Sequence, residues 1–183
     1  MCGINGFLTV GDGRDAAGHV DQMNAALAHR GPDEGGVQRI DFGAVGMRRL
    51  SIVDLAHGRQ PMTTADGDCT LVYNGELYDT DGLRDQLSAR GYTFRTRSDT
   101  EVLLNALAAD GRDCLQYLNG MFSFALIDHQ GRSAFLARDH LGIKPLFYYL
   151  TPRGDLVFSS EIKSLVTHPA VPRRLDHRSL AML

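Results

Sequence analysis

The stretch FSFALIDHQGRSAFLAR, residues 122–138, consists of two apolar runs on either side of a short polar segment. The runs Phe122–Asp128 and Ala134–Arg138 have the composition of β-strands, and His129-Gln130-Gly131 between them has the composition of a turn. A turn this short can only bring the two strands together side by side and antiparallel. The stretch therefore predicts a β-hairpin and, with it, an antiparallel sheet.

The same alternation of apolar runs and tight turns continues on both sides of this hairpin. Further strands are expected at Gly6–Val10, Gly43–Ile52, Cys69–Asn74, Leu146–Leu150 and Leu156–Ser159. Helices are expected at Val20–Arg30 and Leu83–Arg90, and after the capping box Ser98-Asp99-Thr100-Glu101. Strands outnumber helices and follow one another across short turns, so the pattern predicts an α+β fold with helices covering antiparallel sheets.

Length, charge and cysteine content narrow the class of protein. With 183 residues and a net charge of -3, the chain fits one domain and gives no reason to expect nucleic acid or an anionic membrane as a partner. No apolar run has the length of a membrane span, and the first residues lack the basic stretch of a signal peptide. Cys2, Cys69 and Cys114 are far apart and odd in number, which does not indicate a disulfide framework. We therefore expect a cytoplasmic protein.

The last residues follow a different pattern from the rest. We expect one domain over residues 1–170, whereas Val171–Leu183 is basic at Arg173 and Arg174 and has no closing turn. Residues 171–183 are therefore expected to be the start of a linker or of a truncated C-terminal domain.

Cys2 is the first candidate for chemistry. Removal of Met1 would give Cys2 both a thiol and a free α-amino group, whose ordinary pKa values are about 8.5 and about 8. The amine could then take the thiol proton near neutral pH, and the thiolate could attack a carboxamide and release ammonia. Taken alone, Cys2 is more simply explained as a small residue in front of a strand.

Asn74 and Gly75 are candidates for stabilising an oxyanion. They follow an apolar strand, and an Asn amide beside a glycine N–H can supply two donors to a developing negative charge. The simpler interpretation is an ordinary Asn-Gly turn.

Arg49 and Asp99 are candidates for holding a charged substrate. Arg49 could bind a carboxylate with its planar guanidinium, or it could be a solvated charge at a strand end. Asp99 could receive an ammonium group, or it could simply stabilise the N-terminus of the helix that it begins. The seven histidines show no metal-ligand spacing, and no nucleotide-binding motif occurs in the chain.

Taken together, these features resemble one family, the class II glutamine amidotransferase domain of the asparagine synthetase type, which is an N-terminal-nucleophile (Ntn) hydrolase. The resemblance covers roughly residues 1–168, and residues 30–33 fit the asparagine synthetase type better than the sugar-phosphate or purine-pathway types. It implies a four-layer αββα sandwich of two antiparallel sheets between helices. The strings that carry it are MCGI (1–4), HRGPD (29–33), RLSIVD (49–54), QPM (60–62), YNGE (73–76), SDTE (98–101), GMFSFA (120–125), RDHLGIKPL (138–146) and FSSEIK (158–163).

The resemblance also implies roles for individual residues. Cys2 would be the nucleophile with its own amine as base once Met1 is removed, and Asn74 with the Gly75 N–H would form the oxyanion hole. Arg49 would bind the α-carboxylate of glutamine. Residues near the α-amino group would be Glu76 and Asp99, and the pocket would be lined by the backbone of Leu50, Ser51, Ile52 and Val53.

The implied activity is hydrolysis of glutamine to glutamate and ammonia. The ammonia would serve an ATP-dependent amidation in a C-terminal synthetase domain, in cis or as a separate chain. The Ser-Gly-Gly-Leu-Asp-Ser loop of such a domain does not occur here, so no cofactor is expected in this chain, and ATP and magnesium would belong to the synthetase domain. The sequence leaves open whether the acceptor is aspartate or another carboxylate, and whether the chain forms a homo-oligomer.

Two other functions fit the same residues. One is a catalytically silent regulatory or docking domain of the same fold, and the other is a hydrolase acting on a different amide. The joint presence of Cys2, Arg49, Asn74, Gly75 and Asp99 favours an active glutaminase over a silent domain.

Overall fold

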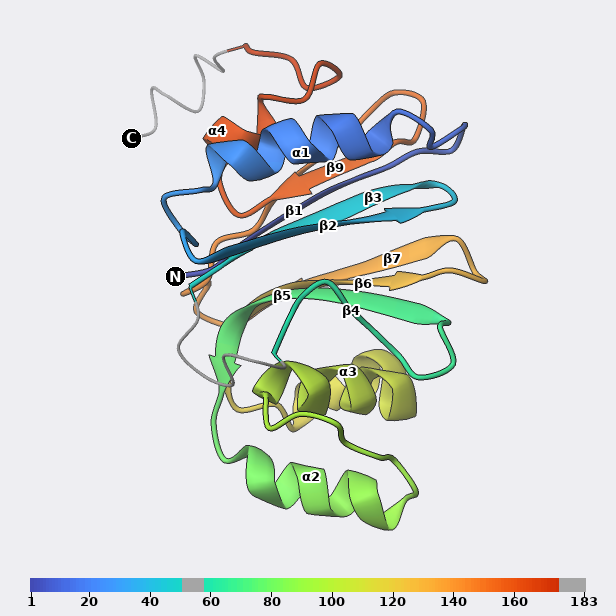
Figure 1. Ribbon diagram of the computed structural model, residues 1–183, viewed down its shortest axis with the longest axis vertical. Helices are drawn as coiled ribbons and strands as arrows, with labels where there is room; N and C mark the ends of the chain where they lie inside the picture. Colours follow the sequence, from blue (N-terminus) through green and yellow to red (C-terminus); the bar gives the residue numbers. More distant parts are fainter. Residues whose placement is uncertain (51–57, 175–183) are drawn as a thin grey trace.

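In the computed structural model, which describes residues 1–50 and 58–174, the strands form two antiparallel sheets (Figure 1). The five-stranded sheet has the order β2-β3-β1-β9-β8, and the four-stranded sheet has the order β4-β5-β6-β7. The strands are β1 (Gly3–Leu8), β2 (Glu34–Ile40), β3 (Gly43–Arg49), β4 (Met62–Thr63), β5 (Cys69–Leu77), β6 (Gly120–Asp128), β7 (Ser133–Arg138), β8 (Phe147–Leu150) and β9 (Leu156–Ser159). The helices are α1 (Ala16–Ala26), α2 (Thr80–Ala89), α3 (Asp99–Asp110), the 3₁₀ helix η1 (Gly111–Gln116) and α4 (Ile162–Leu165).

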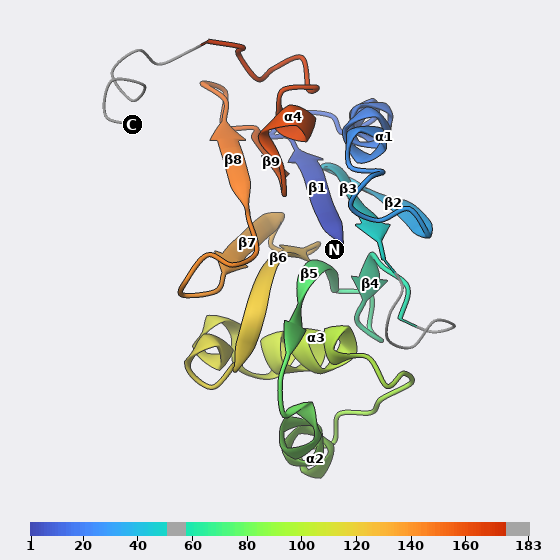
Figure 2. The same cartoon turned by 90° about the vertical axis from the view of Figure 1, so that its left-hand side faces the viewer.

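The elements are arranged in layers, helix, sheet, sheet, helix. Figure 1 shows α1 and α4 over the outer face of the five-stranded sheet, and α3, with α2 beyond it, below the four-stranded sheet. Figure 2 shows that the chain begins at the level where the two sheets face one another. The α+β class and the αββα arrangement implied by the resemblance are therefore confirmed.

Apolar side chains alternate along β5 because each face of this strand is covered by a different layer. Leu71 and Tyr73 pack with α3 in the outer core cluster, whereas Val72 packs between the sheets with Ile4 of β1 and Phe158 of β9. All five side chains are buried. The four-stranded sheet is thus buried on both faces, as a central layer of a sandwich must be.

The hairpin predicted from residues 122–138 is present. Strands β6 and β7 pair antiparallel from Ser123↔Arg138 to Asp128↔Ser133. Four residues, 129–132, connect the strands, because Arg132, with a φ of 47°, belongs to the turn and β7 begins at Ser133, one residue before the predicted start. Asp128 closes the turn by accepting a hydrogen bond from the Gly131 N–H at 2.8 Å.

Other boundaries differ from the prediction in ways that follow from pairing. Strand β5 continues past Asn74 to Leu77 because β6 pairs with it along its whole length. Strand β2 was not predicted, since Gly35-Gly36 gives it little strand propensity, and it exists because β3 pairs with all seven of its residues. Helix α1 begins at Ala16 and ends at Ala26, earlier than predicted at both ends. Of the strand predicted over Gly43–Ile52, β3 extends to Arg49, and its last two residues lie outside the described part.

In residues 1–50 and 58–174, helices fall short of the length and apolar character that a membrane crossing requires.

Candidate active site

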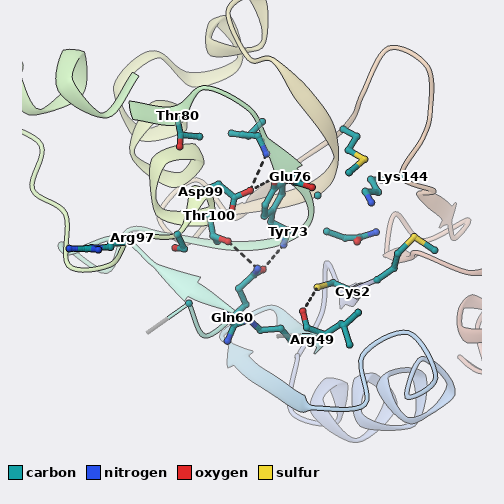
Figure 3. A pocket seen from close by; sticks show the side chains of 18 residues that line it. Cys2, Arg49, Gln60, Tyr73, Glu76, Thr80, Arg97, Asp99, Thr100 and Lys144 are labelled. Carbon is teal, nitrogen blue, oxygen red and sulfur yellow. Dashed lines mark hydrogen bonds between the residues drawn. The ribbon is translucent and has the colours of Figure 1, made fainter. Parts of the chain in front are cut away.

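A cavity of about 510 Å³ opens at the end of the sandwich where β1, β3 and β5 approach one another (Figure 3). The predicted site residues that line it are Cys2, Arg49, Leu50, Asn74, Gly75, Glu76 and Asp99. The other predicted residues, Ser51, Ile52 and Val53, lie outside the described residues. The structure therefore brings together all the described residues that the sequence predicted for this site.

Cys2 lies directly before β1 and faces the space between the sheets. Ile4 is buried in the intersheet core, and the two-residue period of a strand places Cys2 on the same face. The Cys2 side chain is half-buried, and its Sγ lies 3.9 Å from the carbonyl oxygen of Leu50 (Figure 3).

The backbone of Cys2 is held by Arg30, which sequence reasoning did not single out. Arg30 Nε donates to the carbonyl oxygen of Cys2 at 2.8 Å, and Arg30 Nη1 donates to Glu161 at 2.9 Å. His29 contacts the same Glu161 oxygen at 2.9 Å. Partial burial works against ionisation of Glu161, but the hydrogen bonds from Arg30 and His29 outweigh it and lower the pKa of this carboxyl. Arg30 and Glu161 lie in two of the strings that carry the family resemblance, HRGPD and FSSEIK. That resemblance was the only signal in the sequence that could have indicated them.

The register of β5 gives the Gly75 N–H its direction. Tyr78 N donates to Asn119 O across the β5–β6 ladder at 2.8 Å, so the N–H groups of even-numbered residues point toward β6. Those of odd-numbered residues point the other way: Tyr73 N donates to Gln60 Oε1 at 2.7 Å, and Leu77 N donates to Asp99 Oδ2 at 3.0 Å. The Gly75 N–H lies between these two and points toward the cavity.

The Asn74 side chain projects from the face of β5 that looks toward the other sheet. It shares its face with Val72, which packs between the sheets, and so it points toward the layer that carries Cys2. Asn74 is buried, and among the described residues its Nδ2 has no hydrogen-bond partner. Asn74 and Gly75 thus offer the cavity two donors from consecutive residues. Both residues lie inside β5, so they do not form the simple Asn-Gly turn that was the alternative interpretation.

Arg49 is buried at the end of β3, on the face that Met47 presents to the intersheet core. Its Nη1 donates to Glu34 Oε2 at 3.2 Å, across the β2–β3 ladder in which the two residues are paired. Arg59 contacts the other Glu34 oxygen at 3.2 Å. This contact with Glu34 helps to hold the guanidinium of Arg49 at the cavity wall.

Asp99 begins α3 and lies on the far side of the cavity from Cys2 (Figure 3). The preceding Ser98 caps the helix, its Oγ accepting from Glu101 N at 3.4 Å. Asp99 Oδ2 accepts from the Tyr73 hydroxyl at 2.8 Å as well as from Leu77 N. The cap predicted at Ser98 is confirmed, but the reciprocal half of the capping box is replaced, because Glu101 accepts from Arg95 N and Thr96 N and the Ser98 N–H donates to Thr96 Oγ1. Asp99 begins the helix and also lines the cavity.

Further residues that sequence reasoning gave no role also line the cavity. Lys144 is buried in the loop after β7 and reaches the cavity, where Figure 3 shows it opposite Arg97. Tyr73 and Gln60 form the wall between Cys2 and Asp99 (Figure 3). Within the described part of the chain, no group of three or more His, Cys, Asp or Glu residues is arranged to hold a metal ion.

Residues 1–183 match the family described as "Glutamine amidotransferase domain" over the whole chain. The chain belongs to this family. The amidotransferase domain is 42% identical over 184 residues to asparagine synthetase [glutamine-hydrolyzing] 3 of Bacillus subtilis, and the alignment covers 99% of this chain and 30% of the relative. It is 37% identical over 167 residues to asparagine synthetase B [glutamine-hydrolyzing] of Escherichia coli, with 91% of this chain and 30% of the relative covered.

The fold of the amidotransferase domain is shared with a more distant enzyme of known structure. The superposition on glutamine phosphoribosylpyrophosphate amidotransferase from B. subtilis has a TM-score of 0.75 at 20% identity, over 93% of this chain and 44% of the other. This likeness shows that the two proteins share the sandwich fold. The amidotransferase domain spans about a third of the length of the curated relatives that it matches.

Proposed function

We propose that this domain hydrolyses the side-chain amide of glutamine with Cys2 as nucleophile. The observation that carries the proposal is the pair of donors on β5, the Asn74 amide and the inward-pointing Gly75 N–H, at the cavity that Cys2 lines. The Asn74 Nδ2 has no hydrogen-bond partner among the described residues, and together with the Gly75 N–H it is suited to hold a charge that exists only during the reaction.

The chemistry needs no group beyond this chain and water. After removal of Met1, the free amine of Cys2 takes the thiol proton, and the thiolate adds to the amide carbon of glutamine. Asn74 and Gly75 then hold the oxyanion of the tetrahedral intermediate. As the intermediate collapses, the C–N bond breaks, the ammonium of Cys2 returns the proton to nitrogen, and ammonia leaves. Water hydrolyses the resulting thioester to glutamate and restores the thiol.

Arg49 and Asp99, which both line the cavity, suit the two charged groups that a free amino acid carries on its α-carbon. Arg49 would bind the α-carboxylate with its planar guanidinium group, as arginine commonly does. Asp99 and, at the exposed rim, Glu76 would receive the α-amino group. The backbone of Leu50 contributes to the wall beside Cys2, and Ser51, Ile52 and Val53 would continue it.

The ammonia is proposed to be used by an ATP-dependent synthetase domain of the kind implied by the names of the relatives. The relatives at about 40% identity are three times as long as this chain and are called glutamine-hydrolysing asparagine synthetases. ATP and magnesium would act in that second domain, which would be joined in cis or supplied as a separate chain.

Thiol labelling tests the assignment of the nucleophile. The purified chain is weighed by mass spectrometry before and after treatment with a glutamine-like electrophile. We expect loss of Met1 and a single adduct on Cys2 that glutamine prevents, together with ammonia release that Cys2→Ala abolishes. A chain that lacks Met1 and forms no adduct on Cys2, or full ammonia release by Cys2→Ala, would overturn the proposal.

The other two cysteines serve as internal controls for the labelling. Burial raises the pKa of the Cys114 thiol to about 12, and the nearby Asp110 and Asp113 add to this effect. Burial and the surrounding aspartates also raise the pKa of Cys69. Because the thiolate is the reactive form, neither residue should carry the adduct.

A further inference from the structure

The Tyr73 side chain contacts two residues that line different parts of the cavity, Asp99 and Gly75. Its hydroxyl donates to Asp99 Oδ2 at 2.8 Å, and its ring lies against Gly75, where an added Cβ would be 2.6 Å from Tyr73 Cε2. The same side chain therefore contacts Gly75, whose N–H points inward, and the Asp99 carboxylate, which Figure 3 shows beside Tyr73.

We propose that Tyr73 is a positioning residue that orients Asp99 to receive the α-amino group of the substrate, so that the site selects amides of free α-amino acids. This inference rests on the proposed function and deepens it. It concerns the end of the cavity away from Cys2, and it assigns to Tyr73 an effect on substrate choice rather than on the bond that is broken.

The two oxygens of Asp99 differ in their surroundings. Oδ2 accepts two hydrogen bonds, from the Tyr73 hydroxyl and from Leu77 N at 3.0 Å. In the described residues neither a hydrogen bond to Oδ1 nor an ion pair to Asp99 is present. Two fixed donors on one oxygen set the plane of the carboxylate and leave the second oxygen for a ligand that lies in the cavity.

The donors on Asp99 are neutral, which preserves its negative charge for a cationic ligand. Burial raises the pKa of Tyr73 well above its usual value, and the charge of Asp99 and the hydrogen bond to it raise it further. Tyr73 therefore stays protonated, and its hydroxyl donates a hydrogen bond to the carboxylate of Asp99. An ammonium group is the complement of a carboxylate held by neutral donors, because hydrogen bonds to charged groups are about twice as strong as neutral ones.

Tyr73 is itself fixed before any substrate arrives. Its N–H donates to Gln60 Oε1 at 2.7 Å, and Gln60 Nε2 donates to Thr100 Oγ1 at 3.3 Å, which ties β5 to the first turn of α3. Gln60 takes the place of a strand partner here, since β4 begins only at Met62. Tyr73 is 2% exposed. A carboxylate held by so rigid a frame needs little ordering when substrate binds.

The variant Tyr73→Phe removes one oxygen atom and keeps the ring that packs against Gly75. The kinetics of ammonia release are measured, on chains without Met1, with L-glutamine and with 4-carbamoylbutanoate, which is glutamine without its amino group. We expect KM for glutamine to rise about 10- to 100-fold, as for a lost hydrogen bond to a charged group, with kcat changed less than about threefold. Values for 4-carbamoylbutanoate should stay within about twofold of those of the unmodified chain.

Tyr92→Phe is the matched control. Tyr92 packs against the same outer core cluster as Tyr73 but does not line the cavity. Its substitution should leave KM and kcat for both substrates unchanged. If Tyr73→Phe raises KM for glutamine and for 4-carbamoylbutanoate by the same factor, Tyr73 has only a structural role and the inference is wrong. The inference is also wrong if KM for glutamine does not rise in Tyr73→Phe.

Binding measurements separate this inference from the proposed function. In the Cys2→Ala background, calorimetry should show glutamine bound more tightly than 4-carbamoylbutanoate, and Tyr73→Phe should shrink that ratio about 10-fold or more. If the Cys2→Ala chain binds glutamine and the ratio does not change, the inference fails while the proposed function stands. If the mature chain neither binds nor hydrolyses glutamine, the proposed function fails and the inference fails with it.

Discussion

The guanidinium group of Arg30 fixes the backbone of Cys2 by donating from Nε to its carbonyl oxygen at 2.8 Å. Glu161, 131 residues further along the chain, fixes the guanidinium in turn at 2.9 Å. If Met1 is removed as proposed, Cys2 has no preceding peptide bond to restrain it, and this carbonyl is then one of the few points by which its thiol and amine can be oriented.

Arg30→Lys should therefore reduce ammonia release. A lysine ammonium lacks the planar fork that reaches Cys2 and Glu161 at the same time. We expect kcat to fall about 10- to 100-fold, because a displacement of about 1 Å at the reacting atoms has an effect of that order. Steady-state kinetics with glutamine measure this. Arg90→Lys alters an exposed pair with Asp110 and should leave kcat unchanged. An unaltered kcat in Arg30→Lys would show that the carbonyl contact does not position the nucleophile.

Gly75→Ala should impair catalysis more than folding. An added Cβ would lie 2.5 Å from Met121 O and 2.6 Å from Tyr73 Cε2, so the strand would have to shift where its N–H faces the cavity. Loss of a well-placed oxyanion donor reduces kcat by about 100-fold or more, whereas overpacking at one site destabilises by about 1–3 kcal/mol. Ammonia release and chemical denaturation of the same sample measure the two effects.

Gly82→Ala provides the comparison for this variant. Gly82 lies in α2, and an added Cβ there meets no atom within 4 Å. Helix propensity should then raise the free energy of unfolding by up to about 1 kcal/mol, with kcat unchanged. A Gly75→Ala chain that keeps its kcat would remove the Gly75 N–H from the proposed oxyanion hole.

The strands were largely predictable because their apolar alternation is a local property of the sequence. The β6–β7 hairpin and the cores of β5 and β9 were found from that pattern alone. Strand β2 was missed because Gly35-Gly36 carries no such pattern, and its pairing with β3 decides its conformation. The stacking of the sheets was inferred only from the family resemblance, since no local signal specifies which apolar faces meet.

Single residues of the site were ambiguous in the sequence for a related reason. An Asn-Gly pair is most often a turn, and only the register of β5 against β6 shows that Asn74 and Gly75 lie within a strand and point to different faces. Arg30 and Tyr73 act through contacts with residues distant in the chain, Cys2 and Asp99, which no spacing rule predicts.

Asp139→Asn should destabilise the loop that carries Lys144. The Asp139 carboxylate accepts from four backbone N–H groups at 2.9–3.2 Å, those of Phe122, Leu141, Ile143 and Lys144. Burial works against its ionisation, but these donors outweigh burial and lower its pKa. The amide has one acceptor oxygen and a donor that would face backbone N–H groups. We expect a loss of about 1–3 kcal/mol in the free energy of unfolding at pH 7.

The pH dependence of this loss distinguishes the carboxylate from simple packing. A carboxyl whose folded pKa is depressed stabilises the protein above its unfolded pKa of about 3.9, and this stabilisation disappears as the pH falls through the folded value. The difference between the native chain and Asp139→Asn, from urea unfolding at pH 7 and pH 3, should therefore narrow at pH 3. Asp113→Asn, at an exposed position, should give no difference at either pH. If the difference in free energy of unfolding is as large at pH 3 as at pH 7, the Asp139 carboxylate is not the source of the stabilisation.

His168 should make the domain sensitive to mild acid. Its ring is buried, Nδ1 accepts from Ala170 N at 3.2 Å, and Nε2 has no partner among the described residues. Burial and, to a smaller extent, nearby His19 lower the pKa of His168 to about 4 against the opposing effect of Asp155. Because the unfolded chain binds the proton at about pH 6.5, stability is complete above that pH and falls by up to about 3 kcal/mol as the pH approaches 4. Urea unfolding of the native chain and of His168→Gln should therefore show a difference that varies over this interval, whereas the exposed substitution His140→Gln should follow the native curve. Parallel curves for the native chain and His168→Gln would mean that His168 does not remain neutral in the folded state.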